Sequence, residues 1–161
     1  MAGGRILPHA FLLVLVAVSA AAADDPGRLR QQVQQTSDPV ERAKLTAKLG
    51  DEMLKQMAVE YKAKEYEAGG QVLQDYLTAV RAAYQGLKNS GRNARKKPGG
   101  FKELEVHLRK SSRVIEDLSK LVPFEEREAL RLAAAEVGEI RSGLLEALMR
   151  GKGNPAPPSD I

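Results

Sequence analysis

The sequence predicts an all-α protein, in which four long amphipathic helices form two antiparallel helical hairpins packed as a helical bundle. Three observations predict this fold. Apolar residues recur at steps of three and four along most of the chain, which places them on one face of a helix. β-branched residues are sparse and never alternate over a run, so no strand is expected. Two tight elbows and one loop interrupt the pattern, and short elbows make neighbouring helices antiparallel.

The N-terminal residues 1–23 have the three parts of a secretory signal peptide. Arg5 supplies a positive charge, residues 11–18 are apolar, and small residues fill 19–23 as a cleavage site. The apolar and small stretch 10–23 is shorter than the roughly 20 residues that span a membrane. We therefore expect a cleavable signal peptide and export to the periplasm or the medium. No later segment is comparably apolar, so no transmembrane segment is expected in the mature chain.

Four helices are expected in a helical domain at residues 37–150. A polar segment, 24–36, precedes this domain, and only its residues Leu29 and Val33 could pack against the domain. Asp38 is placed to cap the first helix and Pro39 to occupy its first turn. Gly69-Gly70 is expected to end that helix. The expected helices cover residues 39–68, 71–88, 101–122 and 124–149, with a basic loop at 89–100, a break at Pro123 and a disordered tail at 151–161.

Part of this pattern resembles known helical hairpins. The segments Asp38-Pro39-x-x-Arg42-Ala43-x-Leu45, Ala63-Lys64-x-Tyr66-x-Ala68-Gly69 and Leu73-x-x-Tyr76 are similar to exported bacterial helical-hairpin domains of unknown function, over about residues 38–87. The resemblance implies a hairpin and no activity. The stretch 64–69 also looks like a tetratricopeptide elbow, but no 34-residue period follows it.

Composition excludes several kinds of chemistry. The chain has 161 residues, 25 Lys and Arg against 21 Asp and Glu, and no cysteine. It therefore lacks the ligands and nucleophiles of disulfide scaffolds, thiolate metal sites and thiol enzymes. His107 is the one histidine after the signal peptide, and Leu104 stands where a di-iron Glu-x-x-His motif needs glutamate. We expect His107 to lie on a helix surface beside Glu103.

The acidic residues do not predict an active site. They form clusters at Glu116-Asp117, at Glu125-Glu126-Glu128 and at Glu136 with Glu139, and basic residues alternate with them at helical spacing. This pattern is typical of a solvated helix face with local ion pairs. Since no nucleophile–base pair or metal set is visible, we expect no enzyme activity, no catalytic residue, no metal and no cofactor.

The loop is the most unusual stretch of the chain. Six cations and no acid fall within 15 residues, at Lys88, Arg92, Arg95, Lys96, Lys97 and Lys102. One interpretation is an anion-binding patch for an envelope polymer or lipid head groups. The other is a solubilising connector, which the sequence favours. No aromatic residue lies between residues 88 and 100, so nucleic acid is an unlikely partner.

Two further sets of residues have two interpretations each. Four tyrosines on the first hairpin fit core packing better than a ring-lined pocket: Tyr61, Tyr66, Tyr76 and Tyr84. Gly138 and Gly143 in the last helix fit close contact within the bundle, and they also fit contact with a second copy or a protein partner. The sequence thus predicts an exported, non-catalytic binding or structural module of unknown ligand. The alternative is a basic-loop adaptor for anionic surfaces.

Overall fold

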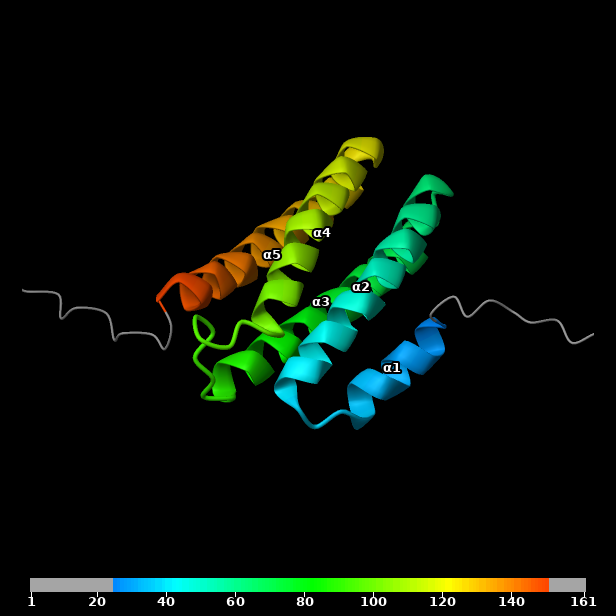
Figure 1. Ribbon diagram of the computed structural model, residues 1–161. Coiled ribbons are helices and arrows are strands. Elements are labelled where there is room, and N and C mark those ends of the chain that lie inside the picture. The colour runs from blue at the N-terminus through cyan, green and yellow to red at the C-terminus, as the bar shows by residue number, and fades with distance from the viewer. Residues whose placement is uncertain (1–24, 151–161) are drawn as a thin grey trace, which may run out of the picture.

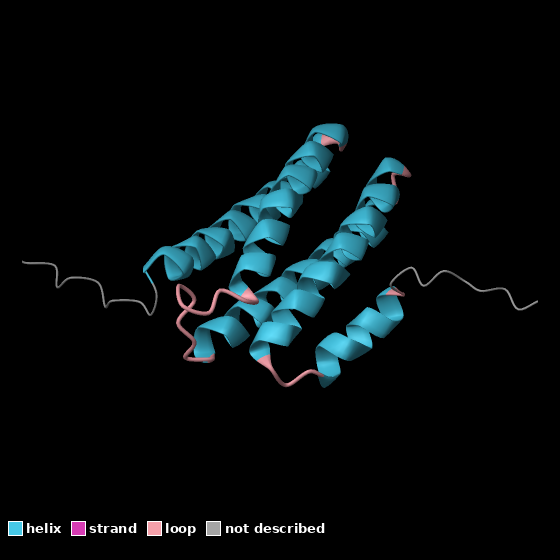
Figure 2. Cartoon of the chain, in the orientation of Figure 1, coloured by secondary structure: helices cyan, strands magenta, loops and turns pink. Residues whose placement is uncertain are grey.

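The computed structural model describes residues 25–150, which form five α-helices and no strand (Figures 1 and 2). The all-α prediction is confirmed over these residues. The expected signal peptide at 1–23 and the expected disordered tail at 151–161 lie outside them. The helices are α1 (Pro26–Gln35), α2 (Pro39–Lys62), α3 (Tyr66–Asn89), α4 (Phe101–Leu121) and α5 (Phe124–Arg150).

The helices pack as two hairpins with one added helix. α2 packs along α3, and α4 packs along α5, as predicted. The hairpins are joined mainly where α2 lies beside α4, and less extensively between α3 and α5. Figure 1 shows both elbows at the same end of the molecule, so α2 and α4 run in the same direction. The short helix α1 packs against α2, and Leu29 is its one buried residue.

Local signals explain where three helices begin. The Asp25 and Asp38 carboxylates accept hydrogen bonds from the backbone N–H of the second residue of α1 and of α2, and each helix begins with a proline. Before α4, Gly100 adopts a φ of 82°, and its N–H donates to Glu103. A Cβ on Gly100 would lie 3.0 Å from the Val40 Cα, so glycine lets the loop cross the start of α2 closely.

The first elbow differs from the prediction. α2 ends at Lys62, the chain turns at Lys64 with a φ of 65°, and α3 begins at Tyr66. Gly69 and Gly70 therefore lie inside α3 and do not end α2. Gly69 is needed for packing, because a Cβ there would lie 3.0 Å from the Tyr61 ring. A lysine in the left-handed region gives no turn signal in the sequence, which is why the glycine pair was misread as the helix end.

The predicted apolar stripes meet in one core between the hairpins. Seven residues that recur at steps of three and four along α4 and just after it are all buried: Phe101, Leu104, Leu108, Ser111, Ile115, Leu118 and Val122. Tyr61 and Tyr76 are buried too, which confirms core packing for these two rings. The largest apolar side chains with almost no exposure are Tyr76, Met57, Leu73, Leu87, Leu104, Leu108, Ile115, Leu130 and Leu144. Each contributes about 1.5–3 kcal/mol by leaving water, so this core holds the hairpins together.

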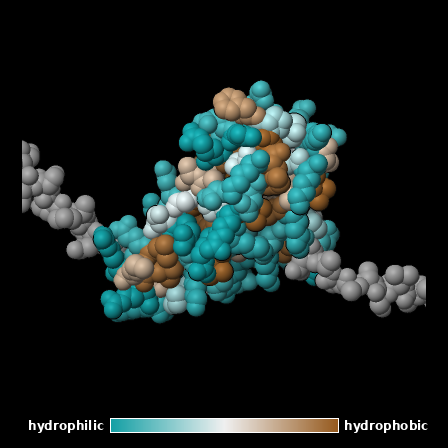
Figure 3. All heavy atoms as spheres, turned by 90° about the horizontal axis from the view of Figure 1, so that it is seen from above, coloured by the Kyte–Doolittle hydropathy of each residue, from teal (hydrophilic) through white to brown (hydrophobic). Residues whose placement is uncertain are grey.

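Some apolar side chains remain on the surface. Seen from the elbow end, hydrophobic residues lie among hydrophilic ones (Figure 3). Near the elbows, Val59, Leu121 and Phe124 are mostly exposed. Among the described residues, no helix is both long enough and apolar enough to cross a bilayer.

Candidate functional site

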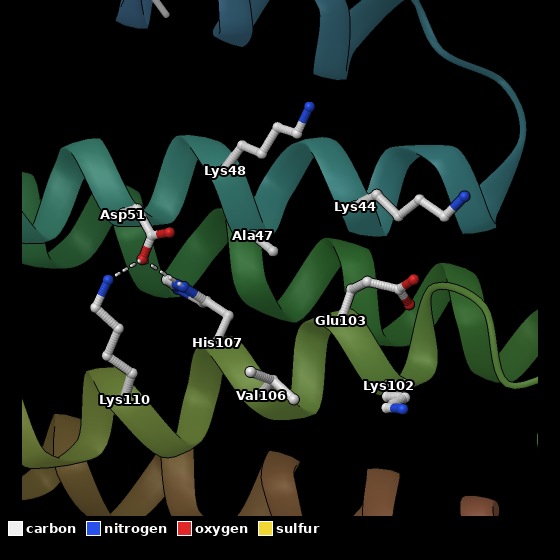
Figure 4. A pocket seen from close by; sticks show the side chains of 9 residues that line it. All are labelled: Lys44, Ala47, Lys48, Asp51, Lys102, Glu103, Val106, His107 and Lys110. Atoms are coloured by element: carbon white, nitrogen blue, oxygen red, sulfur yellow. Dashed lines mark hydrogen bonds and ion pairs between the residues drawn. The ribbon is translucent and has the colours of Figure 1, made fainter.

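A groove lies where the two hairpins meet, between α2 and α4 (Figure 4). Its volume is about 670 Å³, which falls within the range of small-molecule sites. Ala47 from α2 and Val106 from α4 form its apolar part. Charged side chains from the two helices border it: Lys44, Lys48 and Asp51 from α2, and Lys102, Glu103 and Lys110 from α4.

His107 closes one part of the groove from inside the protein, so the prediction of a surface histidine was wrong. Its side chain is only 3% exposed. Nε2 lies 3.1 Å from the Tyr76 hydroxyl, and Nδ1 lies 3.3 Å from Asp51 Oδ1. Glu103, the expected neighbour, instead accepts the Gly100 N–H at 2.7 Å. His107 therefore links three helices, α2, α3 and α4.

The partners of His107 determine its proton positions. A carboxylate only accepts, so Nδ1 carries the proton and donates to Asp51, while Nε2 accepts from the Tyr76 hydroxyl. Burial lowers the pKa of His107, although the Asp51 charge opposes this shift, and the neutral ring fits both bonds. Both nitrogens have partners within the protein. A molecule in the groove could exchange a proton with the ring only by displacing one of these partners.

Asp51 connects this buried chain to the groove. Burial by itself raises the pKa of Asp51, but the hydrogen bonds from Lys110 and His107 and the charge of Lys110 outweigh it, so the pKa falls below its usual value. The Lys110 amine lies 2.9 Å from Asp51 Oδ1, the same oxygen that faces His107. Figure 4 shows both interactions converging on one carboxylate. Asp51 is therefore an anchor between α2 and α4.

Gly50 makes room for this arrangement. A Cβ at Gly50 would lie 2.4 Å from His107 Nε2, 2.7 Å from Cε1 and 3.2 Å from the Tyr76 ring. The two distances to the imidazole are shorter than contacts of a real Cβ allow, so only glycine lets the imidazole lie against the α2 backbone in this position. Gly50 lies on the buried face of α2, four residues before Leu54. The close contact between Gly50 and the His107 ring becomes visible only in the packed structure.

The lysines beside the groove differ in whether they form ion pairs. Lys110 is bound to Asp51, and Lys44 lies 3.4 Å from Glu41. Within residues 25–150, neither Lys48 nor Lys102 forms an ion pair. Lys48 comes from α2 and Lys102 from α4, and Figure 4 shows the Lys48 amine directed away from α4. Four lysines against two carboxylates also leave this groove with an excess of positive charge.

The six predicted anion-binding residues have different surroundings. Lys102 lies beside the groove, whereas the Lys88 amine lies 5.4 Å from the centre of the Tyr84 ring. Arg92 reaches Asp38 at 3.4 Å. Arg95, Lys96 and Lys97 are exposed on the loop, which buried Ala94 holds against the bundle.

The acidic clusters mainly behave as predicted. Asp117 pairs with Lys120 at 2.8 Å and Glu128 with Arg131 at 2.7 Å, both on exposed helix surface. Glu136 instead bridges to Arg81 of α3. Within the described part of the chain, no three residues among His, Cys, Asp and Glu are placed to hold a metal ion.

The two glycines of α5 have different surroundings. A Cβ on Gly143 would lie 2.1 Å from the Tyr84 hydroxyl, which confirms close contact within the bundle there. At Gly138, a Cβ would meet nothing within 4 Å among the described residues, so an intra-bundle contact is wrong for this position. Contact of Gly138 with a second copy stays a prediction.

Comparison with known proteins adds no assignment. No family model, curated protein or solved structure matches this chain. The resemblance to exported helical hairpins therefore stays a prediction. The groove must be interpreted from its own geometry.

The sequence analysis missed most residues of the groove. Lys44, Lys48 and Asp51 recur at steps of four and three on α2, and Lys102, Val106 and Lys110 recur at steps of four on α4. These periodicities indicate a polar stripe on each helix. They do not show that the two stripes border the same groove, because that depends on which faces of the hairpins meet.

Proposed function

We propose that the protein is an exported, non-catalytic binding module whose binding site is the groove between α2 and α4, and that the site takes an anionic molecule. The observation that carries this proposal is the surplus of positive charge at the groove, where four lysines stand against the two carboxylates of Asp51 and Glu103. Charge-assisted hydrogen bonds from amines to an anion are stronger than those between neutral groups.

The surroundings of His107 support binding rather than catalysis. An acid–base catalyst must reach the reacting group through a free nitrogen or one water molecule. In His107, Nδ1 is engaged by Asp51 and Nε2 by Tyr76. The neighbouring carboxylates are likewise occupied, since Asp51 holds Lys110 and Glu103 caps α4. These groups therefore shape the groove and hold its walls together.

Thermal unfolding in phosphate and in chloride of equal ionic strength tests the proposal. Ligand bound only to the folded state raises the melting temperature, and phosphate also stabilises proteins without a site. The comparison of variants removes that general effect. We expect the double variant Lys48→Gln/Lys102→Gln to lose part of the phosphate-specific increase. The matched loop variant Lys96→Gln/Lys97→Gln should keep all of it. The opposite pattern would refute the groove as the site.

The second candidate is the basic-loop adaptor. It is favoured by Arg95, Lys96 and Lys97, which are exposed and form no ion pair within residues 25–150. Retention on heparin or on vesicles that contain anionic lipid tests it. If the loop is the contact, replacing these three residues by serine lowers the salt needed for elution. Unchanged retention would remove this candidate.

A further inference from the structure

The outer face of α4 carries cations that the fold leaves without partners. Arg109 and Arg113 are exposed, and neither forms an ion pair within residues 25–150. Lys102 on the same helix is also exposed and unpaired. Neither arginine lines the groove between α2 and α4. The arginines therefore belong to a second basic surface of the protein.

Helix geometry places these three cations in one line. An α-helix has about 3.6 residues per turn and rises about 1.5 Å per residue. Lys102 and Arg109 are seven residues apart, which is nearly two turns, and Arg113 follows about one turn later. The line is therefore about 16 Å long. It lies on the side of α4 that faces away from buried residues such as Leu108 and Ile115.

A shallow furrow of about 330 Å³ follows the same face, and all of its lining residues come from α4. Arg109 and Arg113 border it, and Val106 contributes apolar surface. Asp117 also borders it, four residues after Arg113, and its carboxylate is held by Lys120 at 2.8 Å. An anion is therefore favoured beside the arginines and is repelled beyond them.

The two arginines repel each other, and no acid of the described chain pairs with them. Residues four apart on a helix have Cβ atoms about 5–6 Å apart, and like charges at this spacing destabilise a helix. Glu105, four residues before Arg109, is buried and bound to Arg141 at 2.9 Å. Asp117, four residues after Arg113, is bound as well. The acids at helical pairing distance are thus already engaged, and an external anion would relieve the repulsion.

The length and composition of this face favour a chain-like anion. A single small anion does not span the line from Lys102 to Arg113. Membrane binding by a helix face requires a broad apolar surface, and Val106 is the one large hydrophobic residue that is exposed among residues 102–117. Single-stranded nucleic acid is held by stacking on aromatic rings, and residues 102–117 contain no Phe, Tyr or Trp. An acidic polysaccharide needs neither feature.

We infer that the outer face of α4 binds an acidic polysaccharide, whose carboxylate or sulfate groups lie along Lys102, Arg109 and Arg113. The planar guanidinium group donates two parallel hydrogen bonds to such anionic groups. This inference goes beyond the proposed function, because it concerns a different surface and a polymer. Binding depends on exposed charges, so it should weaken as the salt concentration rises.

Titration of fluorescently labelled polysaccharides with the purified protein tests this inference. Heparin supplies sulfate and carboxylate groups, polygalacturonate supplies carboxylates alone, and dextran is the uncharged control. We expect both acidic polymers to bind, with an affinity that falls as salt is raised from about 50 to about 200 mM, and dextran not to bind. The ratio of the two affinities shows which anionic group the arginines prefer. Tighter binding to phosphatidylglycerol vesicles than to either polymer would overturn the inference.

Variants locate the contact on α4. Arg109→Gln/Arg113→Gln should weaken binding of the acidic polymers about tenfold at low salt. It should also reduce the slope of log affinity against log salt by about 0.7 for each lost contact. Arg109→Lys/Arg113→Lys keeps both charges, so it should keep the slope and most of the affinity.

Two matched controls remove the same charge elsewhere. Arg28→Gln/Arg30→Gln replaces two exposed arginines of α1 that form no ion pair within residues 25–150. Lys96→Gln/Lys97→Gln replaces two exposed lysines of the loop. Each control should change the affinity much less than Arg109→Gln/Arg113→Gln does.

The outcomes separate this inference from the proposed function. It is wrong if no acidic polymer binds, if either control weakens binding as much as the α4 variant, or if the two-lysine variant loses as much as the two-glutamine variant. The groove is tested independently, because Arg109→Gln/Arg113→Gln should keep the phosphate-specific stabilisation that Lys48→Gln/Lys102→Gln reduces.

Discussion

Replacing Gly50 by alanine tests whether His107 determines the packing of the two hairpins. On helix propensity alone, Gly50→Ala in the interior of α2 should stabilise the protein by about 1 kcal/mol. The structure predicts the opposite, because the new Cβ would lie 2.4 Å from His107 Nε2. The imidazole must then move and lose its partners Asp51 and Tyr76.

The magnitude follows from two costs and one gain. Overpacking of a tight interior costs about 1–3 kcal/mol, and a buried polar group left without its partner costs about 1–3 kcal/mol. After the gain in helix propensity of about 1 kcal/mol is subtracted, Gly50→Ala should lower the free energy of unfolding by about 3 kcal/mol, within a range of about 1–5 kcal/mol. Urea unfolding followed by far-ultraviolet circular dichroism measures this quantity.

Two controls make the result specific. Gly138→Ala places the same change in the interior of α5, where a Cβ meets nothing within 4 Å among the described residues, so it should stabilise by about 1 kcal/mol. In a His107→Ala background, Gly50→Ala should cease to destabilise, which gives a coupling energy of about 2 kcal/mol or more. If Gly50→Ala stabilises the protein as Gly138→Ala does, the described packing of His107 against Gly50 is wrong.

Three further predictions concern other buried polar groups. Thr46→Val should stabilise by about 1 kcal/mol, because the Thr46 hydroxyl is buried without a hydrogen-bond partner among the described residues; a loss of stability in urea unfolding would contradict this. Arg141→Met should lower the free energy of unfolding by about 2 kcal/mol, since it leaves buried Glu105 unpaired. Arg81→Met breaks an exposed pair and should lower it by about 1 kcal/mol or less. Equal losses for the two variants would be inconsistent with the described burial. Because burial lowers the pKa of His107 below 6.5, the unfolded chain takes up a proton first as the pH falls. The free energy of unfolding should therefore be constant above about pH 6.5 and decrease below it. His107→Gln should make this decrease smaller between pH 6.5 and 5. An unchanged decrease in the variant would show that other groups cause it.

The fold could be predicted from the sequence because its main determinants are local. The 3.6-residue period of α4, the cap at Asp38 and the break at Pro123 lie within the segments that they control. The first elbow could not be placed, because Lys64 adopts a positive φ without a glycine. The close contact of Gly69 with the Tyr61 ring joins two helices, so it leaves no trace in the local pattern.

The candidate site was largely unpredictable for the same reason. His107 contacts Asp51 and Tyr76, which lie 56 and 31 residues away in the sequence. Only Lys102 of the groove was among the predicted anion-binding residues. One sign was present: His107 lies next to Leu108 and one turn after Leu104, at the edge of the apolar stripe. A polar residue at that edge is a candidate for burial, and it needs partners from other helices that a single sequence does not identify.

The most direct test of the central claim is to map where an anionic ligand binds, by two-dimensional ¹H–¹⁵N NMR of the protein during a titration with inorganic phosphate. We predict saturable shifts at the amides of Ala47, Lys48, Lys102 and Val106, and small changes elsewhere. Shifts confined to the loop around Arg95 or to the exposed elbow residues would show that the groove between α2 and α4 is not the binding site.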